Sequence, residues 1–317
     1  MDQKNIFGNN KMKRYFFSIC FLFLSNFTNL NAVENKIEFK VNNEIITTLD
    51  IFAEIRYLET INDEFRKLKK NQAFEIAKKS LIREKIKEIE LKKDIEKITI
   101  DNDLLNKIIV NNFKKNEIKS ISDFDNFFLL IDIDPNFIKK KISIEVSWNQ
   151  MIYSKFSKNI KIDKKLILSD LQNKSIQKEY LLSEILFNLN ENEKLVQKFN
   201  FLKEEINKKN FSQTALEHSI SESANKGGKL GWIKEASINV KIKKVLNQTE
   251  IDNYTSPIVI PGGFLILKLE DIRETNIDYD INDELQKIVK KQTNEQLNQF
   301  SNIYFSKVKK DVSINEL

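Results

Sequence analysis

Glycine is scarce in this chain and is concentrated in two short segments. Five of the six glycines lie in residues 225–232, NKGGKLGW, and in residues 256–269, SPIVIPGGFLILKL. The second segment also contains two of the three prolines. Glycine is needed where the backbone adopts a positive φ or where two backbone segments approach closely. The clustering therefore predicts one compact unit with tight turns, and we expect a functional site in this unit.

The composition is that of a globular protein. Of the 317 residues, 41% are hydrophobic and 31% are charged, so the chain is long enough for two or three domains and disorder is not indicated. The formal net charge is +6, but lysine alternates with glutamate and aspartate along the chain. Because no basic face stands out, no nucleic-acid partner is predicted.

The N-terminal segment has the pattern of a secretory signal peptide. A basic stretch at residues 11–14 precedes an apolar run at residues 15–27, and the small residue Ala32 follows. The run is too short to span a bilayer comfortably. We therefore expect residues 1–32 to be a signal peptide that is removed on export, which leaves no stable membrane span. An uncleaved membrane anchor is the alternative.

Cysteine and histidine each occur once, as Cys20 and His218. Because Cys20 lies within the expected signal peptide, the mature chain would have no disulfide. A His/Cys metal site and a Cys–His catalytic pair are excluded, and a Ser–His–Asp arrangement would have to use His218. Residues 227–231 lack the spacing of a phosphate-binding P-loop. We therefore expect no metal ion and no cofactor.

Residues 33–165 are predicted to form a helical domain that begins with a β-hairpin. Apolar and polar residues alternate over residues 37–46 around an Asn-Asn turn, which is typical of a hairpin. Thr47 and Asp50 have the spacing of a capping box that opens a helix. Further along the chain, apolar residues recur at three- and four-residue intervals. The helices predicted from this period span residues 71–97, 101–115, 122–130 with Ser122 as the cap, and 135–156 with Pro135 in the first turn.

Residues 177–273 are predicted to form an α+β unit, because strand-like and helix-like patterns follow one another. The predicted strands span residues 176–189, 254–260 and 264–269, and the predicted helices span residues 192–208, 211–218 and 238–246. The last two strands are joined by a short turn that contains two glycines.

Residues 280–312 contain a further amphipathic helix. Its apolar face must be buried, and we expect the helix to fold back onto the helical domain. Packing against the central unit and homodimerisation are the alternatives.

Several motifs of the central unit agree in content, order and spacing with one family. The strand at Leu182–Leu186 precedes residues 211–232, FSQTALEHSISESANKGGKLGW, and the closing strand at residues 263–273 follows them. This pattern resembles parvulin-type (PpiC or rotamase) peptidyl-prolyl cis-trans isomerases. The helical domain, the single parvulin-like unit and the returning helix together resemble SurA-like periplasmic chaperones, which implies a periplasmic location.

The resemblance implies rotation about X-Pro peptide bonds, which breaks no covalent bond and needs no cofactor. Parvulins place three polar side chains at this site, and the matching positions here hold Glu184, Ser221 and Leu265. Leu265 has no hydrogen-bonding atom in its side chain. Glu184 and Ser221 are therefore the candidate catalytic residues, and the depleted polar set favours peptide binding over turnover.

The positions that match the family's proline pocket are apolar and comprise Leu230, Ile238 and Ile242. The resemblance implies that they bind substrate. The alternative is that they are core residues, since Ile238 and Ile242 are spaced as on one helix face. His218 matches a position outside the polar set, where it is either a pH-sensitive group or a histidine at a helix end.

The sequence is compatible with three functions. The first is an exported SurA-like folding factor that binds unfolded envelope polypeptides, above all precursors of outer-membrane proteins. The helical domain would then be the main binding surface and the parvulin-like unit an accessory peptide site. The second is an active peptidyl-prolyl isomerase in which Glu184 or Ser221 substitutes for the usual polar groups. The third is a non-catalytic scaffold for another envelope protein.

Overall fold

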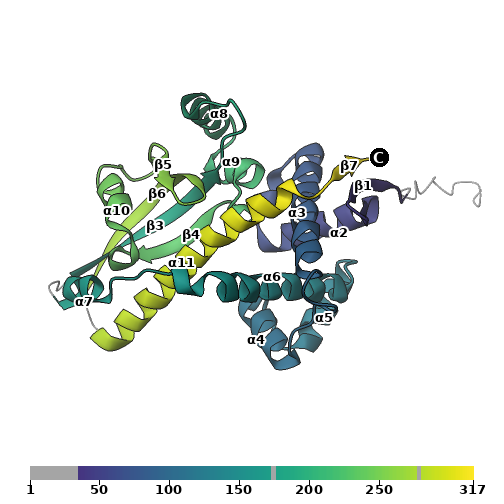
Figure 1. Cartoon of the computed structure of the whole chain (residues 1–317), viewed down its shortest axis with the longest axis horizontal. Coiled ribbons are helices and arrows are strands. Elements are labelled where there is room, and N and C mark those ends of the chain that lie inside the picture. Colours follow the sequence, from purple (N-terminus) through teal and green to yellow (C-terminus); the bar gives the residue numbers. More distant parts are fainter. Residues whose placement is uncertain (1–34, 173–175, 277–279) are drawn as a thin grey trace, which may run out of the picture. The chain divides into compact units, whose positions relative to one another are not determined.

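Helices and two antiparallel sheets make up the part of the chain that the structure, a computed structural model, describes (Figure 1). The described residues are 35–172, 176–276 and 280–317. The fold class is α+β, as predicted. The expected signal peptide, residues 1–32, lies outside the described residues. None of the described helices is both long and apolar enough to cross a membrane.

The first sheet joins segments from the two ends of the described chain. The predicted hairpin is present as β1 (Ile37–Val41) and β2 (Glu44–Thr47), with Asn42 in the turn at a φ of 50°. A third strand, β7 (Ile314–Glu316), pairs with β1 and gives the order β2-β1-β7. Sequence analysis missed β7 because its residues are exposed and show no alternation, so only the neighbouring strand defines it.

The helices that follow begin at the predicted caps, with one exception. Thr47 and Asp50 exchange hydrogen bonds between side chain and backbone, which confirms the capping box. Pro135 is the first residue of its helix, as predicted. The prediction of Ser122 as a cap was wrong, because the hydroxyl oxygen of Ser120 accepts the hydrogen bond from the helix backbone. The helices of this region are α2 (Thr48–Ile61), α3 (Lys70–Leu91), α4 (Asn102–Asn112), α5 (Ile121–Leu130), α6 (Pro135–Phe156) and α7 (Lys164–Gln172).

Two further differences from the predicted helices have local causes. α3 ends at Leu91, before the predicted end at residue 97, because every side chain from residue 92 to residue 97 is exposed. Without buried contacts, a further helical turn gains little stability. α7 was not predicted, since it is short, and its apolar residues Ile167 and Leu171 are buried only by packing against Ile288.

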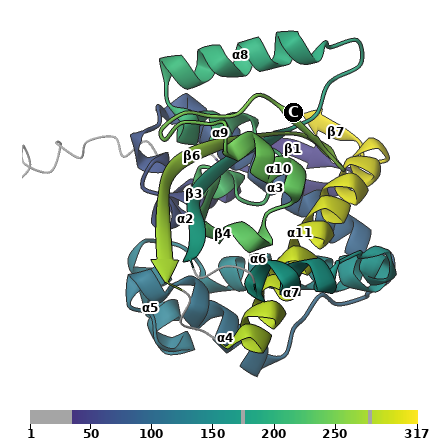
Figure 2. The same cartoon turned by 90° about the vertical axis from the view of Figure 1, so that its left-hand side faces the viewer.

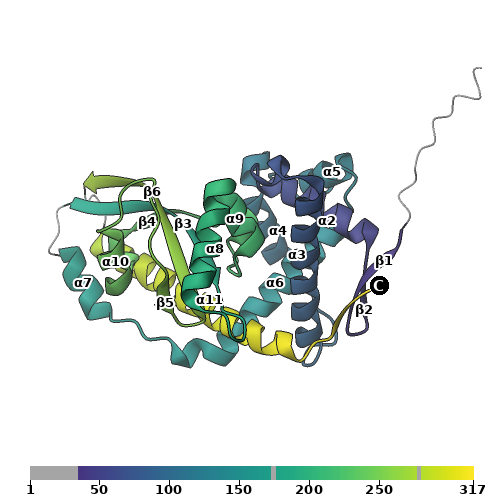
Figure 3. The ribbon, with the colours of Figure 1, turned by 90° about the horizontal axis from the view of Figure 1, so that it is seen from above.

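Helices α2, α3 and α6 pack around two lysines of low exposure, and Figure 3 shows α2 and α3 side by side. Lys141 Nζ on α6 lies 2.7 Å from Glu54 Oε2 and 2.5 Å from Glu84 Oε2. Lys87 Nζ on α3 lies 2.6 Å from Glu145 Oε2 on α6. A buried charge without its partner is strongly destabilising. The two lysines therefore hold the three helices in one mutual arrangement.

The second sheet has the strand order β4-β3-β6-β5 and is antiparallel throughout (Figure 1), and Figure 2 shows its long strands β3 and β6 side by side. Its strands are β3 (Ile176–Phe187), β4 (Lys229–Lys234), β5 (Ile258–Ile260) and β6 (Gly263–Asn276). β4 was not predicted, because glycines make its segment look like a loop, and pairing with β3 is what extends it. The predicted strand at residues 254–260 is correct only from Ile258, since Tyr254 makes an isolated bridge.

Helices cover both faces of this sheet. The helices are α8 (Leu195–Lys208), α9 (Phe211–His218) and α10 (Val240–Leu246). Side chains alternate between the two faces along a strand. On β6, Leu265 and Leu267 therefore pack with α10, whereas Ile266 packs with α8 and α9.

The C-terminal helix α11 (Ile281–Lys310) contacts both the helical region and the second-sheet region. Trp148 Nε1 on α6 donates a hydrogen bond to Ser301 Oγ at 2.8 Å. Lys234 Nζ at the end of β4 lies 2.6 Å from a carboxylate oxygen of Glu284. Contacts with the helical domain and with the central unit, which were alternatives in the sequence analysis, are therefore both present.

The division of the chain into domains stays a prediction. Contacts join residues 37–317 into one compact unit. The predicted domains were residues 33–165, 177–273 and 280–312. Between them the secondary structure changes from mainly helical to a sheet with helices, and then to a single long helix.

A buried glutamate predicts how the stability of this fold depends on pH. Glu88 on α3 has carboxylate oxygens 2.9 Å from Lys140 Nζ and 3.0 Å from Lys92 Nζ. Burial alone would raise the pKa of Glu88, but hydrogen bonds from Lys140 and Lys92 outweigh burial and lower it to about 2. The folded state thus binds this proton less tightly than the unfolded chain does. The charged form stabilises the fold above pH 4.5, and this contribution is lost as the pH falls to about 2.

We expect Glu88→Gln to lower the free energy of unfolding at neutral pH by up to about 3 kcal/mol and to flatten its acid dependence. Urea unfolding, followed by circular dichroism across the acid range, measures both effects. Glu96→Gln, at an exposed position just beyond α3, is the matched control. Parallel curves of stability against pH for the wild type and Glu88→Gln would contradict the assignment.

Candidate functional site

A glycine turn and the long strand β3 bring the candidate residues together. Gly227 and Gly228 have φ values of 68° and 76°, in the left-handed region that favours glycine. The backbone amide of Glu184 on β3 donates to the Gly228 carbonyl oxygen at 2.8 Å. A Cβ atom on Gly228 would lie 2.2 Å from the Glu184 carbonyl oxygen, so a larger residue would push the loop away from β3. The tight turn predicted from the glycines is confirmed.

Three serines at alternate positions form a chain of hydroxyl groups that ends on a carboxylate. The Oγ atoms of Ser219 and Ser221 are 2.9 Å apart, and those of Ser221 and Ser223 are 2.8 Å apart. Ser223 donates to Glu184 Oε1 at 2.8 Å. The two candidate catalytic residues, Glu184 and Ser221, therefore share one network. Sequence analysis missed Ser219 and Ser223, although their two-residue spacing was a signal that the three serines share a side.

The electrostatics of this network centre on its carboxyl group. Burial raises the pKa of Glu184 above its ordinary value, and hydrogen bonds from Ser223 and Ser221 lower it by less. A carboxyl group with a raised pKa stays protonated up to a higher pH. The protonated group donates as well as accepts hydrogen bonds. Hydroxyl groups can reverse direction with it. The hydrogen bonds of the network can therefore run in either direction.

Leu265 lies on the same face of the sheet as the candidate carboxylate but adds no polar atom. Across the β3–β6 pair, Glu184 is opposite Leu267, and Leu186 is opposite Leu265. Leu265 is buried in the apolar cluster of this face. The polar network is thus bordered by aliphatic side chains along β6. A peptide carbonyl at this face would meet hydrogen-bond donors from one side only.

The three positions of the predicted proline pocket do not behave alike. Ile238 is buried and Ile242 is half-buried, and both pack in the cluster that contains Leu265. Leu230 is 38% exposed and is not a member of that cluster. Ile242 lies on α10, whereas Ile238 precedes this helix, which begins at Val240 and not at residue 238 as predicted. Both pack as core residues, which was the alternative interpretation. Their role in substrate binding stays a prediction.

An open groove lies in the helical region, at a place that sequence analysis did not specify. Its volume is about 1050 Å³, and it is formed by α2, α3, the turn between them and the end of α9. The aromatic and aliphatic lining residues are Phe52, Ile55, Phe65, Leu68, Ala73, Phe74 and Ile76, and the polar ones include Lys70, Lys79, Glu59, Glu75 and Glu217. Apolar clefts with a few polar groups at the rim are typical binding sites.

Helix α3 also holds the segment that carries the serines. Gln72 Nε2 donates to Glu217 Oε1 at 2.9 Å, and Arg83 donates to the Ile220 carbonyl oxygen at 2.8 Å. These hydrogen bonds connect α3 to the end of α9 and to the residue between Ser219 and Ser221. No local sequence pattern predicts these two hydrogen bonds, because their partners are more than a hundred positions apart.

Comparison with known proteins confirms the resemblance of the central unit. Residues 184–271 match the family model described as Rotamase, the PPIC-type PPIASE domain. The chain is 33% identical to the chaperone SurA of Pseudomonas putida over 117 residues, which cover 35% of this chain and 27% of that relative. The chain therefore spans about a quarter of the length of this curated relative.

Two solved structures were also matched. A PpiC-type peptidyl-prolyl cis-trans isomerase domain is 28% identical, with 32% of this chain and 96% of that chain covered and a TM-score of 0.27. A SurA-like chaperone of Campylobacter jejuni is 18% identical, with 89% of this chain and 99% of that chain covered and a TM-score of 0.35. The segment at residues 184–271 is thus similar in sequence to PPIC-type isomerase domains, and the chain is similar over about a third of its length to the chaperone SurA.

Proposed function

We propose that this chain is a periplasmic SurA-like folding factor that binds unfolded envelope polypeptides, including precursors of outer-membrane proteins. The single observation that carries this proposal is the open apolar groove of α2 and α3 beside a parvulin-like unit. In this proposal the groove is the main binding surface. The parvulin-like unit is an accessory site for extended peptide.

The chemistry of the groove fits clients of many sequences. Burial of one large apolar side chain contributes about 1.5–3 kcal/mol, and aromatic lining residues such as Phe52 and Phe74 accept such side chains without a fixed hydrogen-bond pattern. Association costs several kcal/mol in lost freedom. Two or three anchoring side chains then give weak and reversible binding, which a folding factor needs in order to release its client.

Peptidyl-prolyl isomerisation is the second candidate function, and the hydroxyl chain that ends on Glu184 favours it. Catalysis has to lower a rotation barrier of about 18–20 kcal/mol. Polar groups around the rotating carbonyl would have to supply this effect. Because Leu265 contributes no polar atom on the β6 side, we infer that the unit binds prolyl peptides without useful turnover.

A charge placed in the groove should impair client binding. Phe74 lines the groove and is half-buried, so Phe74→Asp puts a carboxylate where an apolar side chain would bind. We expect about tenfold weaker suppression of aggregation when a denatured outer-membrane β-barrel protein is diluted from urea, measured by light scattering. Ile55→Asp, at a second lining position, should have the same effect.

The matched control is Leu130→Asp on α5, a side chain that is 85% exposed. Circular dichroism melts verify that each variant is folded. Suppression of aggregation that is equal for Phe74→Asp, Ile55→Asp and Leu130→Asp would refute the groove as the binding surface. Absence of client binding by the wild type would instead favour the scaffold hypothesis.

Proline-limited refolding separates binding from catalysis. Uncatalysed X-Pro isomerisation gives refolding phases of about tens to hundreds of seconds. We expect the rate of this phase to be unchanged by an equimolar amount of the chain. An accelerated phase that returns to the uncatalysed rate in Ser221→Ala and Glu184→Gln would overturn this expectation and establish the isomerase.

A further inference from the structure

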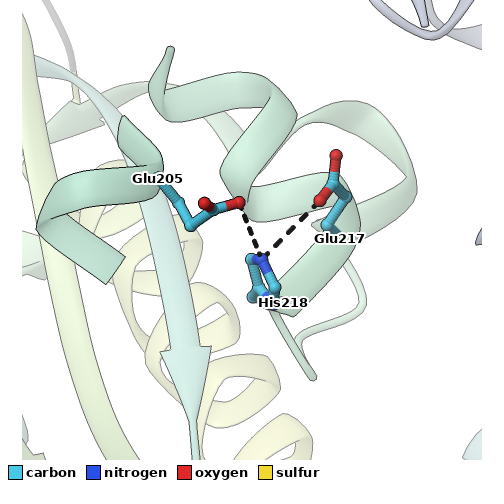
Figure 4. Close-up of side chains that lie close together, drawn as sticks. All are labelled: Glu205, Glu217 and His218. Atoms are coloured by element: carbon cyan, nitrogen blue, oxygen red, sulfur yellow. Dashed lines mark ion pairs between the residues drawn. The ribbon is translucent and has the colours of Figure 1, made fainter. Parts of the chain in front are cut away.

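We propose that Glu205, Glu217 and His218 form a binding site for one divalent transition-metal cation, with zinc as the best match. Glu205 lies near the end of α8, and Glu217 and His218 are the last two residues of α9. Figure 4 shows the imidazole facing both carboxylates. The sequence analysis assigned no metal ligand, because the two glutamates join the only histidine through the packing of α8 on α9. This proposal is independent of the proposed function.

The ligand atoms already lie close to a coordinating arrangement. One atom from each side chain can be chosen so that all three lie within 4.8 Å of one another. His218 Nε2 is 3.6 Å from Glu205 Oε2 and 3.7 Å from Glu217 Oε2. Zinc bonds of roughly 2.0–2.2 Å in a tetrahedron place neighbouring ligand atoms about 3.3 Å apart. The two distances from His218 Nε2 are therefore within a few tenths of an ångström of this spacing, and all three side chains can reach one ion.

The surroundings of His218 Nε2 point to a bound ligand. Nε2 of His218 is buried, and the carboxylate oxygens of Glu205 and Glu217 lie just beyond hydrogen-bond distance from it, at 3.6 and 3.7 Å. A buried polar atom without a partner costs free energy. The Phe201 ring stands edge-on to the imidazole at 5.1 Å and fixes its orientation.

The type of donor selects the type of cation. One imidazole nitrogen with two carboxylate oxygens is a set that zinc accepts, and three protein ligands leave a fourth position open. Calcium and magnesium prefer six or more oxygen ligands, which this cluster does not provide. Glu217 is oriented by a hydrogen bond from Gln72 on α3. Such supporting hydrogen bonds are typical of metal ligands.

Lys209 provides a cation that a metal ion would replace. Its Nζ atom lies 2.6 Å from Oε2 of both Glu205 and Glu217, so the carboxylates are already arranged around one shared positive charge. The lysine side chain is 23% exposed and has a flexible stem, so it can move into solvent. A zinc ion then balances two carboxylates that one ammonium group balances only in part. Lysine and zinc therefore compete, and removal of the lysine should favour zinc.

The experiment uses the full chain with Cys20→Ser, so that His218 is the only imidazole or thiol group. Zinc chloride is titrated while the single histidine Cε1–H signal is followed by NMR and the affinity is measured by calorimetry. We expect this signal to shift and to saturate at one zinc ion per chain. We expect His218→Gln and Glu205→Gln to bind zinc about tenfold or more weakly, and Lys209→Met to bind it more tightly.

Glu204→Gln is the matched control, because Glu204 is exposed on the same helix and pairs with Lys208. Its zinc affinity should equal that of the wild type. Circular dichroism verifies the fold of each variant. A histidine signal that does not move at millimolar zinc, or a His218→Gln variant that binds zinc as tightly as the wild type, would overturn the site.

Discussion

The contact between α3 and residues 217–225 is the constraint on which the rest of the site depends. Arg83 donates to the Ile220 carbonyl oxygen at 2.8 Å and to Asn302 Oδ1 on α11 at 3.3 Å, and its guanidinium group lies 4.7 Å from the Phe305 ring centroid. One cation thus joins three segments that are far apart in the sequence. Loss of a buried partner of this kind costs about 1–3 kcal/mol, and it would remove one of several hydrogen bonds between α3 and this segment.

The same short segment separates two surfaces of different chemistry. Glu217 lines the apolar groove of the helical region, and Ser219 begins the hydroxyl chain that ends on Glu184. The groove suits apolar side chains of any sequence, whereas the hydroxyl chain suits the polar atoms of a peptide backbone. The groove and the hydroxyl chain are therefore separated by only the end of α9.

Local sequence signals were reliable where the interaction itself is local. The capping box of Thr47 and Asp50 and the helix start at Pro135 need only neighbouring residues, and both are present. The sequence misplaced a cap at Ser122, because Ser120, two positions earlier, is an equally good capping residue. Strand β4 was missed since it directly follows Gly227 and Gly228 and contains Gly231, and pairing with β3 is what extends it.

The sequence by itself determined the glycine turn. The backbone at Gly228 has a positive φ, which residues with a side chain disfavour, and a Cβ atom there would collide with the backbone of β3. From the resemblance, the sequence also predicted Glu184 and Ser221 as the polar residues of the site, and the structure places both in one hydrogen-bonded network. Only the tertiary structure decided that Ser219 and Ser223 complete that network and that Glu205 faces His218. Hydrogen bonds and ionic contacts between distant residues depend on distances of a few ångströms, and those are set by packing rather than by residue order.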